Sequence, residues 1–173
     1  YIDPEPLEEL LPAVGAMNID LKGIRPEFYR KVCKGKVGPV LETIRRAAGA
    51  GVHVEVTNLL IPTYNDSDEE IRALAEFVAS VSPYLPLHLS GYHPEYRLNA
   101  PSTSVALLMR ARAIASKYLQ YVFIGNVPTT GGNDSICPQC GAELIRRVGY
   151  RTEVSGLAGT RCAACGSETR IVR

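Results

Sequence analysis

The sequence lacks the features of a membrane protein or a secreted protein. It contains no run of eighteen apolar residues, and no charged segment followed by an apolar stretch opens it. We therefore expect neither a membrane span nor a secretion signal. An excess of one charge is also missing, because 19 Lys and Arg residues face 18 Asp and Glu residues and the formal net charge is +1. The overall charge therefore does not indicate nucleic acid or a membrane surface as a partner.

An initiator methionine and a disordered leader are missing too. The chain opens Tyr1-Ile2-Asp3-Pro4, in which Asp3 suits a helix N-cap and Pro4 the first helical position. A helix over 4–11 that begins at once is typical of a piece of a longer polypeptide. We therefore expect the natural protein to extend upstream of Tyr1. The chain itself is 46% hydrophobic and 21% charged, which is the composition of a folded globular protein.

Strand and helix patterns alternate along residues 1–128. Strands are expected at 16–22, 53–62, 86–92 and 121–127. Three further helices are expected: one at 39–49, one that begins at a capping box of Ser67 and Glu70, and one at about 103–118. This alternation predicts an α/β fold of parallel strands with right-handed crossovers. Residues 129–134 are expected to form a linker, and residues 135–173 a second small domain.

Polar side chains share one face of each of the first three strands. They are Asn18, Asp20 and Lys22, then His53, Glu55 and Thr57, then His88, Ser90 and Tyr92. A solvated sheet face would explain this pattern in one strand. Three parallel strands linked by helices favour the polar inner wall of a partial barrel, because parallel sheets rarely leave a face open to water. A charged ligand is then expected at the C-terminal ends of the strands.

Four of the five cysteines form two Cys-x-x-Cys pairs, each followed by glycine. The pairs are Cys137 with Cys140 and Cys162 with Cys165. Two such turns complete a closed tetrahedral site of four thiolates, the pattern of a structural zinc ribbon. Iron would use the same ligands and would colour the protein red, and disulfides are a further alternative. Reduced thiolates predict a reducing compartment, the cytoplasm. Cys33 lies outside the pattern and is expected to be a free thiol.

Several segments, in this order, resemble a known enzyme family. They are Asn18-Ile19-Asp20-Leu21-Lys22, the run from Thr57 to Ser67, Ser90-Gly91-Tyr92-His93-Pro94, and Val122 to Val127. With the terminal ribbon, they are similar to the C-terminal portion of radical S-adenosylmethionine (radical SAM) enzymes of the pyruvate-formate-lyase-activating type. The resemblance is greatest to the radical SAM member of the AmmeMemoRadiSam system.

The resemblance implies a partial (β/α) barrel, the C-terminal half of a radical SAM barrel, that binds S-adenosylmethionine and a [4Fe-4S] cluster. Reductive cleavage of the sulfonium would give a 5′-deoxyadenosyl radical, and in activating enzymes a glycine of a partner protein is its target. Asp20 and Lys22 match the motif beside the methionine end of the cofactor, and His93 matches a histidine near its adenosyl part. Thr57 stands where these enzymes carry an arginine, and Gly91 where they carry a larger residue.

The cluster-binding Cys-x3-Cys-x2-Cys motif of the family is missing from the 173 residues. We therefore expect this chain alone to be inactive and the cysteine triad to be encoded upstream of Tyr1. Loss of the preceding strands would also expose a sheet edge, through which two chains could associate. Asp20 and Lys22 could also form a structural ion pair. His53 and His88 are more often satisfied residues of the wall than ligands. Glu55 is either a proton or hydrogen-bond partner inside the barrel or part of an internal salt bridge.

A non-enzymatic module is the alternative to the enzyme. The ribbon carries Arg146, Arg147, Arg151, Arg161, Arg170 and Arg173, so it could bind nucleic acid or a protein partner through these charges. A basic, solvated hairpin is the more common explanation of such a pattern, so a nucleic-acid partner is not expected.

Overall fold

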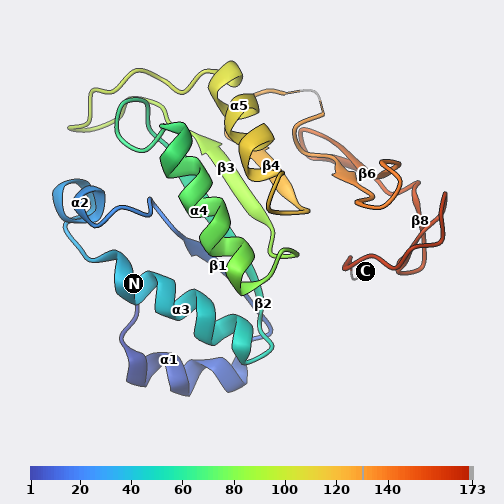
Figure 1. The fold of residues 1–173 in the computed structure, drawn as a ribbon, viewed down its shortest axis with the longest axis horizontal. Coiled ribbons are helices and arrows are strands. Elements are labelled where there is room, and N and C mark those ends of the chain that lie inside the picture. The colour runs from blue at the N-terminus through green and yellow to red at the C-terminus, as the bar shows by residue number, and fades with distance from the viewer. Residues whose placement is uncertain (130, 172–173) are drawn as a thin grey trace.

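A four-stranded parallel sheet lies at the centre of the computed structural model, which describes residues 1–129 and 131–171 (Figure 1). Its strands are β1 (Ala16–Asp20), β2 (His53–Leu60), β3 (Leu87–Gly91) and β4 (Val122–Gly125), in the spatial order β1-β2-β3-β4. The predicted α/β fold and the parallel order of the four strands are confirmed. β1 is an edge strand, as expected, whereas self-association through that edge stays a prediction.

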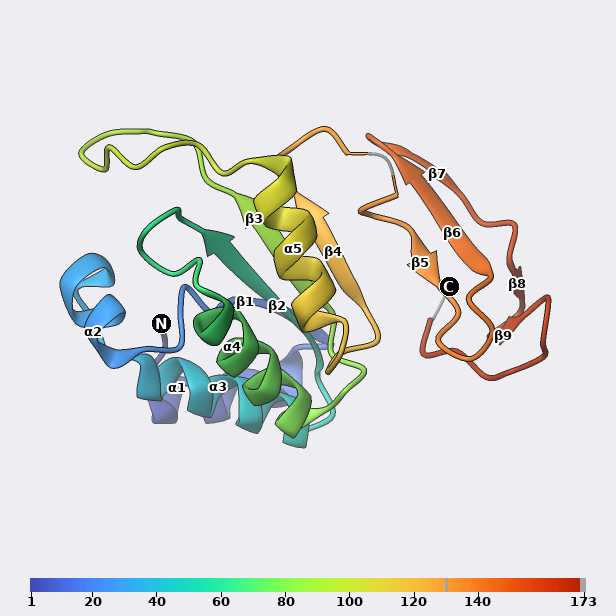
Figure 2. The ribbon, with the colours of Figure 1, turned by 45° about the horizontal axis from the view of Figure 1, so that its top comes forward.

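Helices cover one face of this sheet. The described helices are α1 (Pro4–Leu10), α2 (Pro26–Phe28), α3 (Val37–Gly49), α4 (Asp68–Val81) and α5 (Val105–Ala115), with short 3-10 and π turns η1 (Leu11–Ala13) and η2 (Tyr29–Cys33), and the three long ones, α3, α4 and α5, make this layer. Figure 2 shows α3, α4 and α5 side by side on the same side of the strands. Among the described residues, no helix is long and apolar enough to cross a membrane.

The two faces of the sheet differ as the sequence predicts. Val54 and Val56 of β2 and Leu87 and Leu89 of β3 are buried in the main hydrophobic core, beneath the helices. The alternate residues of both strands are half-buried or exposed. The alternation ends at Gly91, because Tyr92, expected on the polar face, is buried and its hydroxyl donates to the carbonyl of Leu98.

Two predicted helix starts differ in detail from the structure. Ser67 caps α4 by accepting from the Glu70 N–H at 3.2 Å, but the Glu70 side chain does not complete the capping box. It is buried and accepts from the Ile24 N–H at 2.7 Å instead. α5 is capped by Ser104 rather than beginning at Thr103, because the Thr103 hydroxyl is buried between the Tyr92 N–H and the Leu60 carbonyl.

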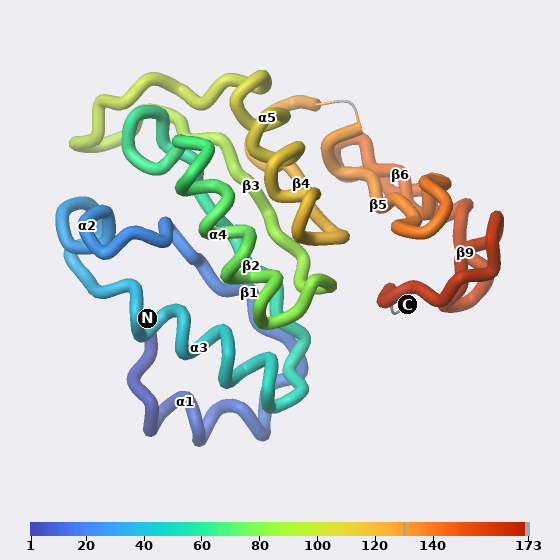
Figure 3. Tube along the Cα trace, viewed as in Figure 1, coloured from blue at the N-terminus to red at the C-terminus, as the bar shows by residue number. Residues whose placement is uncertain are grey.

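The C-terminal part is a small ribbon beside β4. It contains β5 (Ser135–Ile136), β6 (Glu143–Val148), β7 (Arg151–Glu153), β8 (Leu157–Ala158) and β9 (Arg161–Cys162), all paired antiparallel. The segment expected as a linker lies against β4, where Ile124 N–H donates to the Gly132 carbonyl at 3.0 Å. Figure 3 shows the chain end returning from the ribbon toward the sheet. Thr130 of the expected linker and Arg173 of the expected ribbon lie outside the described residues.

Candidate functional site

Asp20 and Lys22 lie at the C-terminal end of β1, as the sequence predicts. Lys22 Nζ is 2.9 Å from Asp20 Oδ2, and the two side chains are 41% and 54% exposed. The structure therefore shows the mutual ion pair that the sequence left open. Because both groups remain half exposed, their charges are accessible to a ligand at this end of the sheet.

Buried amides and a phenol hold the backbone that carries this pair. Asn58 Nδ2 donates to the Leu21 carbonyl at 2.7 Å, and Asn65 Nδ2 donates to the Lys22 carbonyl at 2.7 Å. The Lys22 N–H in turn donates to the Tyr29 hydroxyl at 3.1 Å. Burial raises the pKa of Tyr29 to about 12, so this hydroxyl stays neutral at physiological pH. These contacts fix the loop after β1, which sequence patterns did not reveal.

Glu70 holds the next residues of the same loop. Its carboxylate is almost fully buried, accepts from the Ile24 N–H, and lies 2.5 Å from Arg25 Nε. Gly23 leaves room for this approach, because a Cβ there would lie 2.7 Å from the Phe28 ring and 3.1 Å from Glu70 Oε1. In the sequence, Glu70 stands three residues after Ser67, which is the spacing of a capping box. That spacing predicted a contact at the start of the helix rather than the contact with the loop after β1.

Thr57 and His93 lie at the same end of the sheet as Asp20 and Lys22, and their side chains bond to other residues. Thr57 is the β2 register partner of Asp20, and its hydroxyl donates to Asn18 Oδ1 at 2.9 Å. His93 follows β3, and its Nε2 is 3.1 Å from the Asn126 carbonyl after β4. Asp20, Lys22 and Thr57 are therefore neighbours at one end of the sheet, with His93 beyond the next strand.

A second polar group occupies the other half of the same face. Glu55 contacts two histidines: His53 Nε2 lies 3.3 Å from its Oε1, and His88 Nε2 lies 2.8 Å from its Oε2. Burial opposes ionisation of Glu55, but the two histidines outweigh it and lower the pKa of this carboxyl group. The His88 ring stacks on Phe123, with 5.4 Å between the ring centroids. Glu55 therefore has the internal ion-pair contacts that were one of its two sequence interpretations, and both histidines are satisfied by it.

The four ribbon cysteines converge on one point. Their sulfur atoms all lie within 4.8 Å of one another, with Cys137 Sγ to Cys165 Sγ at 3.8 Å and Cys140 Sγ to Cys162 Sγ at 3.7 Å. A tetrahedral ion with metal–sulfur bonds of about 2.3 Å places its sulfurs about 3.8 Å apart. The spacing fits a single ion. It does not fit a cubane cluster, in which each thiolate binds a different iron and the sulfurs lie farther apart.

The protonation of these thiols also favours a bound cation. The Ser167 hydroxyl lowers the pKa of Cys137 to about 6. The pKa of Cys140 rises to about 12: the Ala142 N–H opposes the rise, but the Cys165 thiol and burial outweigh it. The opposite shifts of Cys137 and Cys140 show two neighbouring thiols competing for negative charge, and a divalent cation would remove that conflict. Cys33 is exposed and separate from this group.

Comparison with known proteins finds a family model that matches the first part of the chain. Residues 1–78 match the family model of the radical SAM superfamily. This stretch contains β1, β2, Asp20, Lys22 and Thr57. The radical SAM part of the sequence prediction is supported by this match, whereas the narrower AmmeMemoRadiSam assignment stays a prediction.

Curated proteins are also similar to this chain. The chain is 44% identical to an uncharacterized protein of Methanocaldococcus jannaschii over 99% of its own length and 52% of that protein. It is 29% identical to a pyruvate formate-lyase-activating enzyme of Clostridium pasteurianum over 53% of this chain and 41% of that enzyme. The chain therefore spans about half, or less, of the length of these curated relatives.

Solved structures show the same fold. A domain of a pyruvate-formate lyase-activating enzyme from Bacteroides vulgatus superposes with a TM-score of 0.64 at 25% identity, over 72% of this chain and 75% of that one. A radical SAM methyltransferase from Sphaerobacter thermophilus gives a TM-score of 0.52 at 20% identity, over 63% of this chain and 33% of that one, and supports the fold alone.

Proposed function

We propose that this chain is the C-terminal portion of a radical SAM enzyme similar to the pyruvate-formate-lyase-activating enzymes, and that its sheet forms part of the barrel wall. The observation that carries this proposal is the family match over residues 1–78, which includes the half-exposed Asp20–Lys22 pair at the C-terminal end of β1. The similarity to a domain of an activating enzyme supports it. The coverage of about half of the relatives supports a longer natural protein.

In this proposal the polar end of the sheet binds S-adenosylmethionine. The Lys22 ammonium pairs with the carboxylate of the methionine part, and the Asp20 carboxylate accepts from its ammonium group. His93 lies near the adenosyl part, and the Thr57 hydroxyl adds one polar contact on the neighbouring strand. A [4Fe-4S] cluster held by cysteines outside these residues would supply the electron that cleaves the sulfonium to a 5′-deoxyadenosyl radical.

The ribbon has a structural part in this proposal. Cys137, Cys140, Cys162 and Cys165 hold one zinc ion with no open position, which suits folding rather than catalysis. The Clostridium relative is named for activating pyruvate formate-lyase, so a protein is the first class of substrate to test. Two ribbon arginines argue against the alternative, a module that binds nucleic acid, because their guanidinium groups pack on aromatic rings of the same chain. Arg147 is half-buried and lies over the Phe123 ring, and Arg170, although exposed, lies over the Tyr84 ring.

Binding of S-adenosylmethionine tests the assignment of Lys22. In the natural full-length protein, Lys22→Gln should weaken this binding about tenfold, because it removes one charge-assisted hydrogen bond to the cofactor. Lys117→Gln, an exposed lysine after α5, makes the same change of charge elsewhere and should leave the affinity unchanged. Isothermal titration calorimetry measures both. Equal affinity of the Lys22→Gln variant and the unmodified protein would show that the cofactor binds elsewhere.

A further inference from the structure

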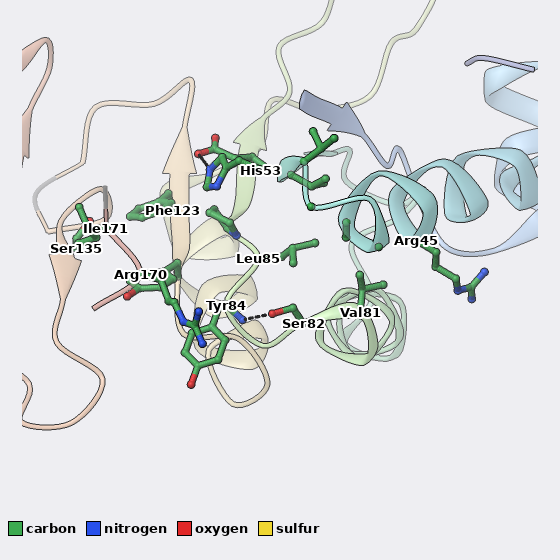
Figure 4. A pocket seen from close by; sticks show the side chains of 18 of the residues that line it. Arg45, His53, Val81, Ser82, Tyr84, Leu85, Phe123, Ser135, Arg170 and Ile171 are labelled. Carbon is green, nitrogen blue, oxygen red and sulfur yellow. Dashed lines mark hydrogen bonds and ion pairs between the residues drawn. The ribbon is translucent and has the colours of Figure 1, made fainter. Parts of the chain in front are cut away.

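A pocket of about 1150 Å³ lies at the opposite end of the strands from Asp20 and Lys22 (Figure 4). One wall comes from the first residues of β2, the segments that precede β3 and β4, and the C-terminal ends of α3 and α4. The ribbon supplies the other wall with Ser135, Ile145, Arg147, Arg170 and Ile171. The pocket therefore exists only where the sheet and the ribbon meet, and the proposed cofactor site does not use it.

The walls of this pocket are largely apolar. Val54, Leu85 and Ile145 are buried side chains that line it. The half-buried ring of Phe123 lies among them, and Figure 4 shows it between His53 and the ribbon residues Ser135 and Ile171. Tyr84 adds a second aromatic ring near the chain end. A large pocket with apolar and aromatic walls and a few converging polar groups is the usual form of a small-molecule site.

Two arginines supply an unbalanced positive charge. Arg147 Nη1 donates to the Asn133 carbonyl and to Ser135 Oγ, both at 2.9 Å, and its guanidinium lies 5.5 Å from the Phe123 centroid. The Arg170 guanidinium lies 4.8 Å from the Tyr84 centroid. Among the described residues, neither has an acidic partner within ion-pair distance.

The only carboxylate among the lining residues does not balance these arginines. It belongs to Glu55, whose two carboxylate oxygens already contact His53 and His88. The hydrogen bonds of Arg147 Nη1 hold its guanidinium in position while its remaining N–H groups have no partner among the residues that the structure describes. A fixed guanidinium of this kind is suited to a planar anion.

We infer that this pocket binds a small organic anion with a flat apolar body, of the class of aromatic carboxylates and sulfonates. The rings of the ligand pack against the apolar wall, beside the Phe123 ring that already stacks on His88 and lies under Arg147, and its anionic group is bound by Arg147 and Arg170. The inference goes beyond the proposed function, because none of its residues belongs to the cofactor site. It also gives the ribbon a role in binding, since the ribbon contributes both arginines.

The fluorescent probe 1-anilinonaphthalene-8-sulfonate has this chemistry, and its titration against the metal-loaded protein tests the site. We expect saturable binding at one site. Arg147→Gln and Arg170→Gln should each weaken it about fivefold or more, because each removes a charge-assisted contact. Arg146→Gln is the matched control, since Arg146 is the exposed neighbour of Arg147 on β6 and does not line the pocket. Its affinity should equal that of the unmodified protein.

Two further measurements separate charge from shape and from misfolding. N-phenyl-1-naphthylamine has the same rings without the sulfonate and should bind at least about tenfold more weakly. Ile171→Trp fills the pocket from a half-buried position near the chain end and should abolish binding of the sulfonate while keeping both arginines. Equal binding of the neutral probe, or equal affinities of Arg147→Gln and Arg146→Gln, would overturn the anion assignment. Unchanged binding in Ile171→Trp would overturn the pocket assignment.

Discussion

Glu55 is a residue whose protonation links stability to pH. Its two histidine partners lower its pKa below the ordinary value of 4.5, against the opposing effect of burial. A carboxyl group with a lowered folded-state pKa stabilises the fold above its unfolded pKa, and this contribution is lost as the pH falls through the folded pKa. We expect the free energy of unfolding to decrease below about pH 4.5, by no more than about 1 kcal/mol from this group, because Glu55 is more than a third exposed.

Urea unfolding of Glu55→Gln between pH 6 and pH 3.5 isolates this contribution. The variant should lose less stability over that range than the unmodified protein, because glutamine does not titrate. Glu76→Gln, on the exposed face of α4, should follow the unmodified protein, and any acid-dependent loss of metal from the ribbon would affect all three proteins equally. Parallel profiles for Glu55→Gln and the unmodified protein would show that the two histidines do not stabilise the carboxylate.

Asn65 joins two elements at the C-terminal end of the sheet. Its Oδ1 accepts from the Ile61 N–H at 2.7 Å, and its Nδ2 donates to the carbonyls of Leu59 and Lys22. Asn65→Ala would leave one buried and two part-buried backbone groups without this partner and should lower the free energy of unfolding by about 2–4 kcal/mol. Asn99→Ala, in the exposed loop after β3, should change it by less than about 0.5 kcal/mol. Similar values for the two variants would contradict this role of Asn65.

The elements with a strong local pattern could be predicted from the sequence, and those fixed by distant contacts could not. The first three strands show alternation of apolar residues, the fourth is a short apolar run, and α4 follows from its apolar stripe and its Ser67 cap. The short α2 and η2 have no such stripe. They are held instead by the burial of Phe28 and Tyr29 in the core. Asp3, a good cap by residue type, makes no side-chain cap hydrogen bond.

The residues of the candidate site also differ in whether the sequence could predict them. Asp20 and Lys22 could be placed at a strand end from spacing alone, and the cysteine group from its two repeated turns. The supports of that strand end, Asn58, Asn65 and Glu70, are recognisable only when residues about forty positions apart meet. The pocket beside the ribbon was also beyond prediction, because it depends on how two separately folded parts of the chain pack together.

At the scale of the whole molecule, the residues that the structure describes form two hydrophobic clusters of very different size. The sheet and its helices share a core that extends from Leu21 to Ile124, whereas the ribbon cluster consists of Cys137, Leu144, Ile145, Leu157 and Cys162. Two of these five residues are the proposed metal ligands. A cluster this small cannot offset the conformational entropy of the ribbon without a further constraint. An ion bound by the four cysteines, as proposed, would therefore supply most of the stability of the ribbon.

Removing the metal should consequently unfold the ribbon and spare the sheet. After chelation, the amide protons of β6 should exchange at the rate of an unstructured peptide, while those of β2 and β3 keep their protection, because their core lies in the other cluster. Cys162→Ser should reproduce this result without chelator. Cys33→Ser, which removes an exposed thiol outside the site, should leave both exchange and metal content unchanged. Hydrogen exchange measured by NMR reports each strand separately. Retained protection of β6 in the metal-free protein would mean that the ribbon folds on its apolar contacts alone, and the four converging sulfurs would then not be what holds it together.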